Sequence, residues 1–460
     1  MRAFDEMPGP PPASTIPAAY ALMKEVRKDL LGLVLRTFRE MGDVFRLEVL
    51  GRKQVLVMAP AQNREVLLEH ASVFEKGKDY TDRRKGLAKF GGAGLITSNG
   101  DFWKRQRRLV APALHAKRIA SYGEAMIRAG RGAMEGWKAG DEVEMDRAMM
   151  AAALEIVART LFSTTVASET ERIADATHAL HGMFEANNSA WTLLPAWFPT
   201  FQRLREDRAV ATLDEIVYRM IRERRPTADG PVSDTGDLAS MLLSAEDEDG
   251  SRMTDLQARD EMVTMFIAGH ETAANTLAWS WILLAKDAAV RATLDEELGR
   301  VLGPAGASRR LPEASDYRAL RYTEAVVKEA LRLFPPAFTV MRTATADTSV
   351  GGFAIPKGTD VSLVPYATHR DARFFPDPER FDPTRFLGEV EPDRYTWLPF
   401  GGGPRVCVGN AFAMMETTLV LATIASRFRP VLADGVDPVP VPGVTLRPSG
   451  PLRMRLEPAS

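Results

Sequence analysis

The chain has almost no cysteine: Cys407 is the single one among 460 residues. One thiol cannot form an intramolecular disulfide, and it cannot build a multi-cysteine metal site. A disulfide-stapled scaffold is therefore excluded, and a reducing compartment is favoured. If Cys407 has a chemical role, it acts as a single ligand or as a nucleophile.

A strong net charge and a membrane-spanning run are lacking as well. The 59 Lys and Arg nearly balance the 61 Asp and Glu, which gives no global attraction to nucleic acid or to anionic lipid. The one long apolar stretch, 262–284, carries His270, Glu271 and Asn275 near its middle, where lipid would make them costly. The first 20 residues lack the apolar core of a signal peptide. We therefore expect a cytoplasmic protein with no transmembrane segment and no nucleic-acid partner.

The composition is that of an ordinary globular protein. Hydrophobic residues make up 45% and charged residues 26% of the chain. No repeat of fixed period and no long low-complexity linker is visible. We predict a Pro-rich N-terminal segment over residues 1–20 and one large domain over residues 21–460.

Hydrophobic patterning predicts a mostly α-helical domain with a small β portion, in α+β fashion. The alternation over 44–50, a Gly51 turn and the apolar run 55–58 predict a β-hairpin. Most of 64–300 is helical in pattern, and short strands are expected at 350–355 and 361–364. Breaks in the helical stretch are expected near three segments: Gly91–Gly100, Leu193–Phe201 and Thr227–Asp237.

One predicted helix is unusually long and buried. Thr254 followed by Gln257 forms a capping box, and helix-forming residues continue to about Ala289. The middle of this helix is apolar on nearly every side, as expected for a helix that crosses a core. A second helix should end at Phe334, because two prolines follow it, and a last helix should follow Cys407.

The segment around the cysteine, Phe400-Gly-Gly-Gly-Pro-Arg-Val-Cys-Val-Gly409, favours a metal-binding thiolate. Glycines let backbone N–H groups approach the sulfur, Arg405 adds a cation, and the amino end of the following helix adds partial positive charge. Without this context, Cys407 would be read as a small buried hydrophobe in a glycine-rich turn. The segment fits Phe-x-x-Gly-x-Arg-x-Cys-x-Gly at every specified position, and it resembles the haem-binding signature of the cytochrome P450 family.

Four other segments resemble motifs of this family, in the family's order, so that the resemblance spans residues 103–413. Trp103 and Arg107 resemble its haem-propionate motif, and 268–272 (Ala-Gly-His-Glu-Thr) resembles its oxygen-binding motif. Glu329-x-x-Arg332 resembles its Glu-x-x-Arg motif, which Arg385 would complete as a buried network. The family's Pro-Glu-Arg-Phe is Pro-Thr-Arg-Phe here, but the arginine is present.

The resemblance implies haem b as cofactor, with Cys407 as the axial ligand of the iron and Glu271 and Thr272 as catalytic residues. Gly269 would leave a gap for oxygen on the long helix. From the residues alone, Thr272 could equally bond to a carbonyl of its own helix, and Glu271 could pair with an arginine. The haem-binding positions implied are Trp103, Arg107, Ala268, Gly269, Arg342, Phe400, Arg405, Cys407 and Gly409.

The implied function is a monooxygenase that inserts one atom of O2 into an apolar substrate. No Gly-x-Gly-x-x-Gly follows a strand, so electrons would come from a separate ferredoxin or flavodoxin with its reductase, docked near Lys104, Arg105 and Arg108. The aromatic stretch 191–201 and the segment 338–340 suggest the apolar substrate. A peroxide-driven hydroxylase, a haem-thiolate isomerase and a non-catalytic haem sensor remain alternatives, and a monomer is expected.

Overall fold

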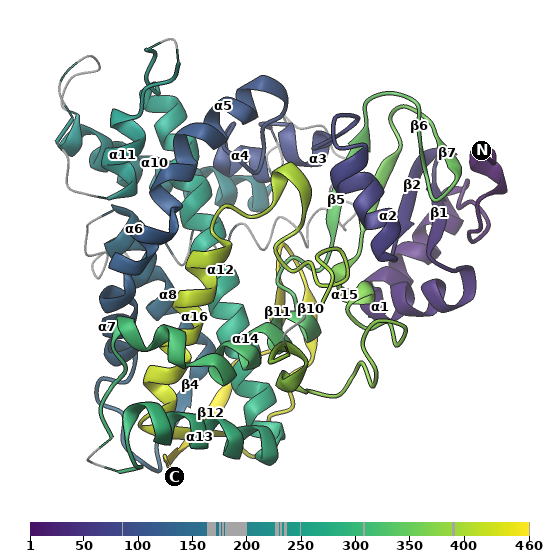
Figure 1. Cartoon of the computed structure of the whole chain (residues 1–460). Coiled ribbons are helices and arrows are strands. Elements are labelled where there is room, and N and C mark those ends of the chain that lie inside the picture. Colours follow the sequence, from purple (N-terminus) through teal and green to yellow (C-terminus); the bar gives the residue numbers. More distant parts are fainter. Residues whose placement is uncertain are drawn as a thin grey trace.

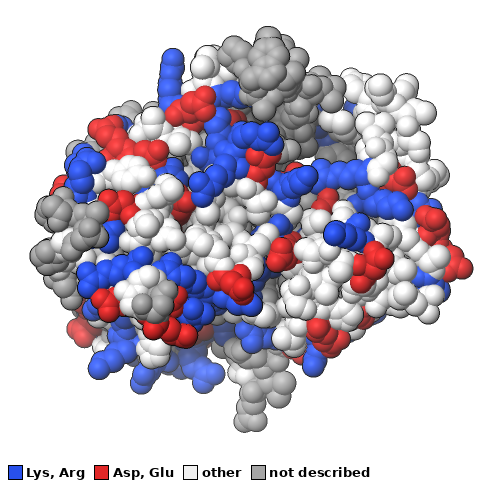
Figure 2. Space-filling model, turned by 90° about the horizontal axis from the view of Figure 1, so that it is seen from above, with Lys and Arg blue, Asp and Glu red and all other residues white. Residues whose placement is uncertain are grey.

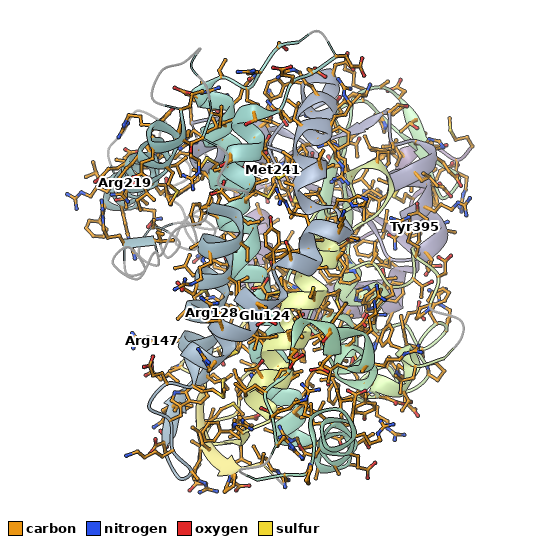
Figure 3. All side chains as sticks on the ribbon, turned by 60° about the vertical axis from the view of Figure 1, so that its left-hand side comes forward. Glu124, Arg128, Arg147, Arg219, Met241 and Tyr395 are labelled. Atoms are coloured by element: carbon orange, nitrogen blue, oxygen red, sulfur yellow. The ribbon has the colours of Figure 1, made fainter. Side chains whose placement is uncertain are left out.

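The computed structural model describes residues 1–84, 86–162, 172–173, 176, 179, 200–225, 230, 232–233, 237–248, 250–306, 309–388 and 392–459. Its helices lie mostly on one side of the molecule and its largest sheet on the other (Figure 1). In Figure 3, Met241 marks the helical side and Tyr395 marks the sheet side. The predicted break at 193–201 falls almost wholly outside the described residues.

The helical side is built around two largely buried helices, α12 and α16. Helix α12 (Asp255–Lys286) packs against α8, α10, α14 and α16. The helices of the described residues are α1 (Ile16–Met41), α2 (Pro60–Arg64), α3 (Lys78–Thr81), α4 (Leu87–Gly91), α5 (Gly100–Val110), α6 (Ala116–Ser121), α7 (Gly123–Ala133), α8 (Met145–Phe162), α10 (Phe201–Arg224), α11 (Leu238–Ser244), α12, α13 (Ala288–Leu302), α14 (Arg321–Leu333), α15 (Pro365–Thr368) and α16 (Asn410–Ala425).

The sheet side contains a five-stranded sheet of order β1-β2-β8-β5-β3, in which only β2 and β8 run parallel. Shorter turns of helix, η1 (Phe4–Glu6), η2 (Glu65–Glu69), η3 (Ala111–Leu114), η5 (Ala314–Ala319), η6 (Pro383–Phe386) and η7 (Gly403–Arg405), connect the elements. The strands are β1 (Val44–Val49), β2 (Arg52–Val57), β3 (Phe74–Glu75), β4 (Glu142–Glu144), β5 (Val340–Ala344), β6 (Thr348–Val350), β7 (Phe353–Ile355), β8 (Asp360–Leu363), β9 (Phe428–Leu432), β10 (Pro440–Pro442), β11 (Leu446–Pro448) and β12 (Arg453–Pro458).

Several predicted elements are confirmed, whereas the strand expected at 350–355 is instead a hairpin of β6 and β7 that turns at Gly351 and Gly352. The hairpin β1–β2 turns at Leu50 and Gly51, both with positive φ, as a two-residue turn requires. The side chain of Thr254 caps α12 and Gln257 closes the predicted capping box. Helix α14 ends at Leu333, one residue before Phe334 and its prolines. The mostly helical α+β class is therefore confirmed.

The N-terminal segment packs against the sheet side. Phe4 and Met7 are buried among the side chains of the five-stranded sheet, and Ala13 bridges to Val49. Helix α1 begins at Ile16, so the predicted boundary at residue 20 falls inside a helix. No helix in the described ranges has the length and apolar character that a membrane crossing requires.

Candidate functional site

The loop that carries Cys407 has a tightly folded backbone. The Cys407 N–H donates to the Phe400 carbonyl at 2.9 Å, and Gly401 and Gly403 both have positive φ. A Cβ on Gly403 would lie 1.8 Å from the Leu67 carbonyl oxygen, so only glycine lets the loop approach η2 this closely. These bonds hold the cysteine three residues before α16 begins.

The Cys407 side chain is accessible, although enough protein lies around the sulfur to desolvate it. Burial raises the pKa of the Cys407 thiol above its ordinary value, whereas the Gly409 N–H bonded to the sulfur and the nearby Arg107 lower it. We expected the three consecutive glycines to supply the N–H donors. In the structure Gly409 supplies this bond, and the first glycines shape the loop.

A cluster of cations lies beside the cysteine loop. Arg107 donates to the Val406 carbonyl at 2.7 Å, and Arg405 donates to the Ser98 carbonyl at 3.0 Å. The Arg405 guanidinium also lies over the ring of Trp103, 4.2 Å from its centre. Trp103 thus orients Arg405, while Arg107 holds the loop, so the two residues of the predicted motif have separate tasks.

The cations of this cluster repel one another. Burial, Arg342 and Arg107 lower the pKa of Arg405 to about 10, although Glu75 opposes the shift. Burial, then Arg342 and Arg405, hold the pKa of the Lys76 ammonium well below its usual range. Buried like charges are costly unless an anion joins them. An accessible thiol beside these cations fits a group with an iron centre and carboxylate side chains, as haem has.

Segment 92–99 connects the cysteine loop to α12. On one side, Arg405 donates to Ser98 O and to Asn99 Oδ1, each at 3.0 Å. On the other side, the Leu95 N–H donates to Glu261 on α12 at 3.1 Å. The cation cluster and the first turns of α12 are thus fixed to the same short segment.

Between its two ends, helix α12 is buried except for a short accessible strip. Ile267, Ala268, Gly269 and Thr272 are partly accessible, whereas nearly all their neighbours on the helix are buried. We expected Gly269 to open a gap for oxygen, but a Cβ there would lie 3.0 Å from Val157 Cγ2. The absence of a side chain on Gly269 therefore lets α8 pack closely on α12, and Ala268 and Thr272 are the residues whose side chains border the open side.

The two predicted catalytic residues have different surroundings. The Thr272 hydroxyl donates to the Ala268 carbonyl of its own helix at 2.7 Å. Its oxygen can therefore still accept a hydrogen bond from another group. Glu271 is buried and accepts a hydrogen bond from the Thr445 hydroxyl of the chain leading into β11. Burial raises the pKa of Glu271 to about 7, while Thr445 and then Arg447 oppose the rise.

The predicted network of Glu329, Arg332 and Arg385 is present and buried. Arg332 Nε and NH2 donate to the two Glu329 oxygens at 2.6 and 2.8 Å, and Arg385 Nε lies 3.3 Å from Glu329 Oε1. The remaining N–H groups of Arg332 donate to three backbone carbonyls, those of His369, Pro378 and Arg380. All five donors of this guanidinium are therefore engaged.

Two histidines have structural positions. His369 is buried, its Nδ1 lies 3.0 Å from the Arg332 carbonyl, and its Nε2 accepts from the Leu398 N–H at 3.0 Å. Burial and Arg332 lower the pKa of His369 to about 3, so the ring is neutral near pH 7. His270 is buried with Nδ1 against the Phe266 carbonyl. Both rings are therefore held by backbone groups.

Thr445 and Asn275 belong to the site, although their roles were not predicted. Asn275 carries one signal, since it is a polar residue one turn after Glu271 in an apolar helix. Thr445 carries no local signal, because only the folded chain brings it to α12.

Comparison with known proteins gives one consistent result. Residues 8–454 match the family described as Cytochrome P450. Two similar proteins from Streptomyces melanosporofaciens are cyclooctatin synthase, 39% identical over 91% of this chain and 89% of the relative, and cyclooctat-9-en-7-ol 5-monooxygenase, 38% identical over 91% and 88%. Pentalenene oxygenase of Streptomyces avermitilis is 33% identical over 90% of each chain.

Proposed function

The chain belongs to the cytochrome P450 family and is a haem-thiolate monooxygenase, and on this premise we propose that Cys407 is the ligand of the iron of haem b and that the substrate is a cyclic terpenoid. The observation that carries the site assignment is the accessible Cys407 thiol beside the cluster of Arg107, Arg342 and Arg405. The bound haem would supply thiolate-supported reductive activation of O2. The protein's own residues bind, orient and supply protons.

Each residue of the site has a defined task in this proposal. The Gly409 N–H stabilises the sulfur, and Phe400 anchors the loop through its carbonyl. Arg107, Arg342 and Arg405 would hold the carboxylates of the haem. Ala268 and Gly269 would present apolar surface on the open side of α12. Thr272 and Glu271 hold and move protons.

The substrate class rests on two kinds of observation. The accessible strip of α12 is apolar apart from Thr272, which suits a hydrocarbon. Two relatives are named for cyclooctat-9-en-7-ol and pentalenene. We expect a cyclic terpenoid to shift the Soret band on binding and to stimulate NADPH consumption with a surrogate ferredoxin and its reductase. Terpenoid binding without reductant consumption would contradict the proposal and would favour a haem sensor, an isomerase or a peroxide-driven enzyme.

Thr272→Ala should uncouple the reaction. The Thr272 proton is engaged by Ala268, so we propose that its oxygen accepts from a water molecule and fixes that water beside the site of oxygen reduction. A positioned proton transfer contributes roughly 10²–10⁴-fold in rate. The variant should still consume NADPH and O2 but should release more hydrogen peroxide and less product.

Thr276→Ala is the matched control for this variant. Thr276 lies one turn further along α12 and bonds to the Thr272 carbonyl in the same way, but it is buried. It should keep the parent ratio of product to NADPH. An unchanged ratio in Thr272→Ala as well would mean that its hydroxyl serves only its own helix.

The electron donor is proposed to be an acidic ferredoxin or flavodoxin that docks beside α5. The structure corrects the predicted cationic surface, because Arg105 and Arg108 both pair with Asp247, at 2.9 and 3.0 Å, and Lys104 pairs with Asp101. Basic and acidic side chains also lie side by side on the face seen from above (Figure 2). Lys104 and Arg108 remain well exposed and are therefore the cations that a partner would contact.

Arg108→Glu should slow electron transfer from such a donor and weaken its dependence on ionic strength, because exposed charges act over only about 8 Å in physiological salt. Arg147→Glu is the control, since Arg147 is 82% exposed and lies away from α5 at the edge of the molecule (Figure 3). If the electron-transfer rate depended equally on salt in both variants and in the parent, the proposed docking site would be wrong.

A further inference from the structure

The side chain of Glu271 is held by the chain that enters β11. The Thr445 hydroxyl donates to Glu271 Oε1, and the Asn275 amide donates to Thr445 Oγ1 at 3.0 Å. All three side chains are buried: 1% of Glu271 is exposed, and 7% of both Asn275 and Thr445. The hydroxyl proton of Thr445 is donated to Glu271, and the hydroxyl oxygen accepts a hydrogen bond from the Asn275 amide. The hydroxyl therefore has one defined orientation.

The support for this hydroxyl is rigid. Glu271, Asn275 and Trp279 follow one another at intervals of one helical turn, and each contacts the same strand region. The Trp279 indole N–H donates to the Leu446 carbonyl at 3.3 Å, and the Leu446 N–H donates to the Pro336 carbonyl at 3.0 Å. Thr445 is thus fixed between α12 and the chain that follows α14.

We propose that Thr445, supported by Asn275, is a positioning residue that orients the Glu271 carboxyl for proton delivery. The proposal rests on the monooxygenase function, because only that reaction needs protons delivered beside Thr272. Glu271 directly precedes Thr272, the polar residue of the accessible strip, so its carboxyl leaves α12 about 100° around the helix axis from the Thr272 hydroxyl. In this proposal protons pass between the two side chains through water, and the bond from Thr445 fixes the carboxyl end of that path.

Two titratable side chains lie close to Glu271. Arg447 on β11 lowers the pKa of the carboxyl, and the ring of the neighbouring His270 has Nδ1 against the Phe266 carbonyl. With a pKa of about 7, Glu271 is present in both protonation states near neutral pH, as an efficient proton donor should be. Since the bond from Thr445 lowers this pKa, its loss should raise the pKa and keep the carboxyl protonated at higher pH.

The test compares Thr445→Val with Thr445→Ser in the haem-loaded resting protein. The first readout needs no turnover: the infrared band of protonated Glu271, assigned by its loss in Glu271→Gln, is followed against pH. We expect the midpoint near pH 7 to move upward by about one pH unit in Thr445→Val and to return in Thr445→Ser. Asn275→Ala should give a smaller upward shift, because it acts through Thr445.

The second readout is the amount of hydrogen peroxide released per NADPH, which should rise in Thr445→Val. Its dependence on pH should have the same midpoint as the infrared band. Thr423→Val is the control, since Thr423 is buried in α16 and bonds only within its own helix, to the Leu419 carbonyl. It should leave both readouts unchanged.

An unchanged infrared midpoint in Thr445→Val, or the same shift in Thr423→Val, would overturn the proposal. If Thr445→Val does not fold, the midpoint in Asn275→Ala decides in its place. A parent protein that oxidises no terpenoid would refute the proposed substrate class, and the infrared titration would still decide the position of Thr445.

Discussion

Replacement of Cys407 by serine should abolish the red-shifted Soret band of the reduced carbon monoxide complex and all monooxygenase activity. A serine hydroxyl stays protonated where a thiol deprotonates, so the variant lacks the anionic sulfur that gives this band. The loop itself should survive, because its fold depends on the Phe400 carbonyl and on Gly401 and Gly403, which the substitution does not touch. The measurement is the carbon monoxide difference spectrum beside the haem content.

Asn410→Ala provides the control for this spectrum. Asn410 lies three residues after the cysteine and its side chain bonds to the Ala411 N–H, not to the sulfur. It should keep the band. A Cys407→Ser protein with the parent spectrum would show that the iron ligand is another residue. As a check without turnover, a thiol reagent should modify the haem-free protein, whose single thiol is accessible, and should spare the haem-loaded protein.

Glu329→Gln should lower the free energy of unfolding by about 3–5 kcal/mol and yield little haem-loaded protein. The substitution leaves Arg332 and Arg385 without their carboxylate, and a buried charge deprived of its partner has a cost of this size. Glu329 also accepts the Asp382 N–H at 2.9 Å, so the chain ahead of the cysteine loop loses an anchor. Denaturant unfolding and the ratio of haem to protein measure the two effects.

Glu324→Gln on the same helix is the matched control. Glu324 pairs with Lys328 at 3.2 Å, one turn apart on the partly exposed face of α14, and such pairs contribute only about 0–1 kcal/mol. It should leave stability and haem content nearly unchanged. A Glu329→Gln protein with full haem and stability but no turnover would assign Glu329 to catalysis instead of folding.

Local patterns predicted those features that neighbouring residues determine. The hairpin at Gly51, the capping box of Thr254 and the helix end before Pro335 depend on backbone preferences within a few residues, and the structure confirms them. The motif around Cys407 was recognised because its residues are contiguous. Arg385 could be paired with Glu329 only through the resemblance, since more than 50 residues separate them.

Features that depend on distant contacts were missed or misjudged. Gly269 was expected to leave a gap for oxygen, whereas its close approach to Val157 was not predicted, because it depends on how α8 packs. The cationic character of Arg105 and Arg108 was overestimated because Asp247 is far away in the sequence. The strands β9 to β12 after α16 were not predicted, since strands of three to six residues leave too short a pattern.

The burial of Phe4 and Met7 matters for how this protein can be shortened or tagged. These side chains fill the edge of the five-stranded sheet, and the backbone of Arg2 bonds to Gly352 and Ala354. The first 15 residues look dispensable from the sequence alone. Their deletion would expose apolar surface beside β6 and β7 and would promote aggregation. A purification tag is therefore better placed after β12, whose last residue, Pro458, is exposed.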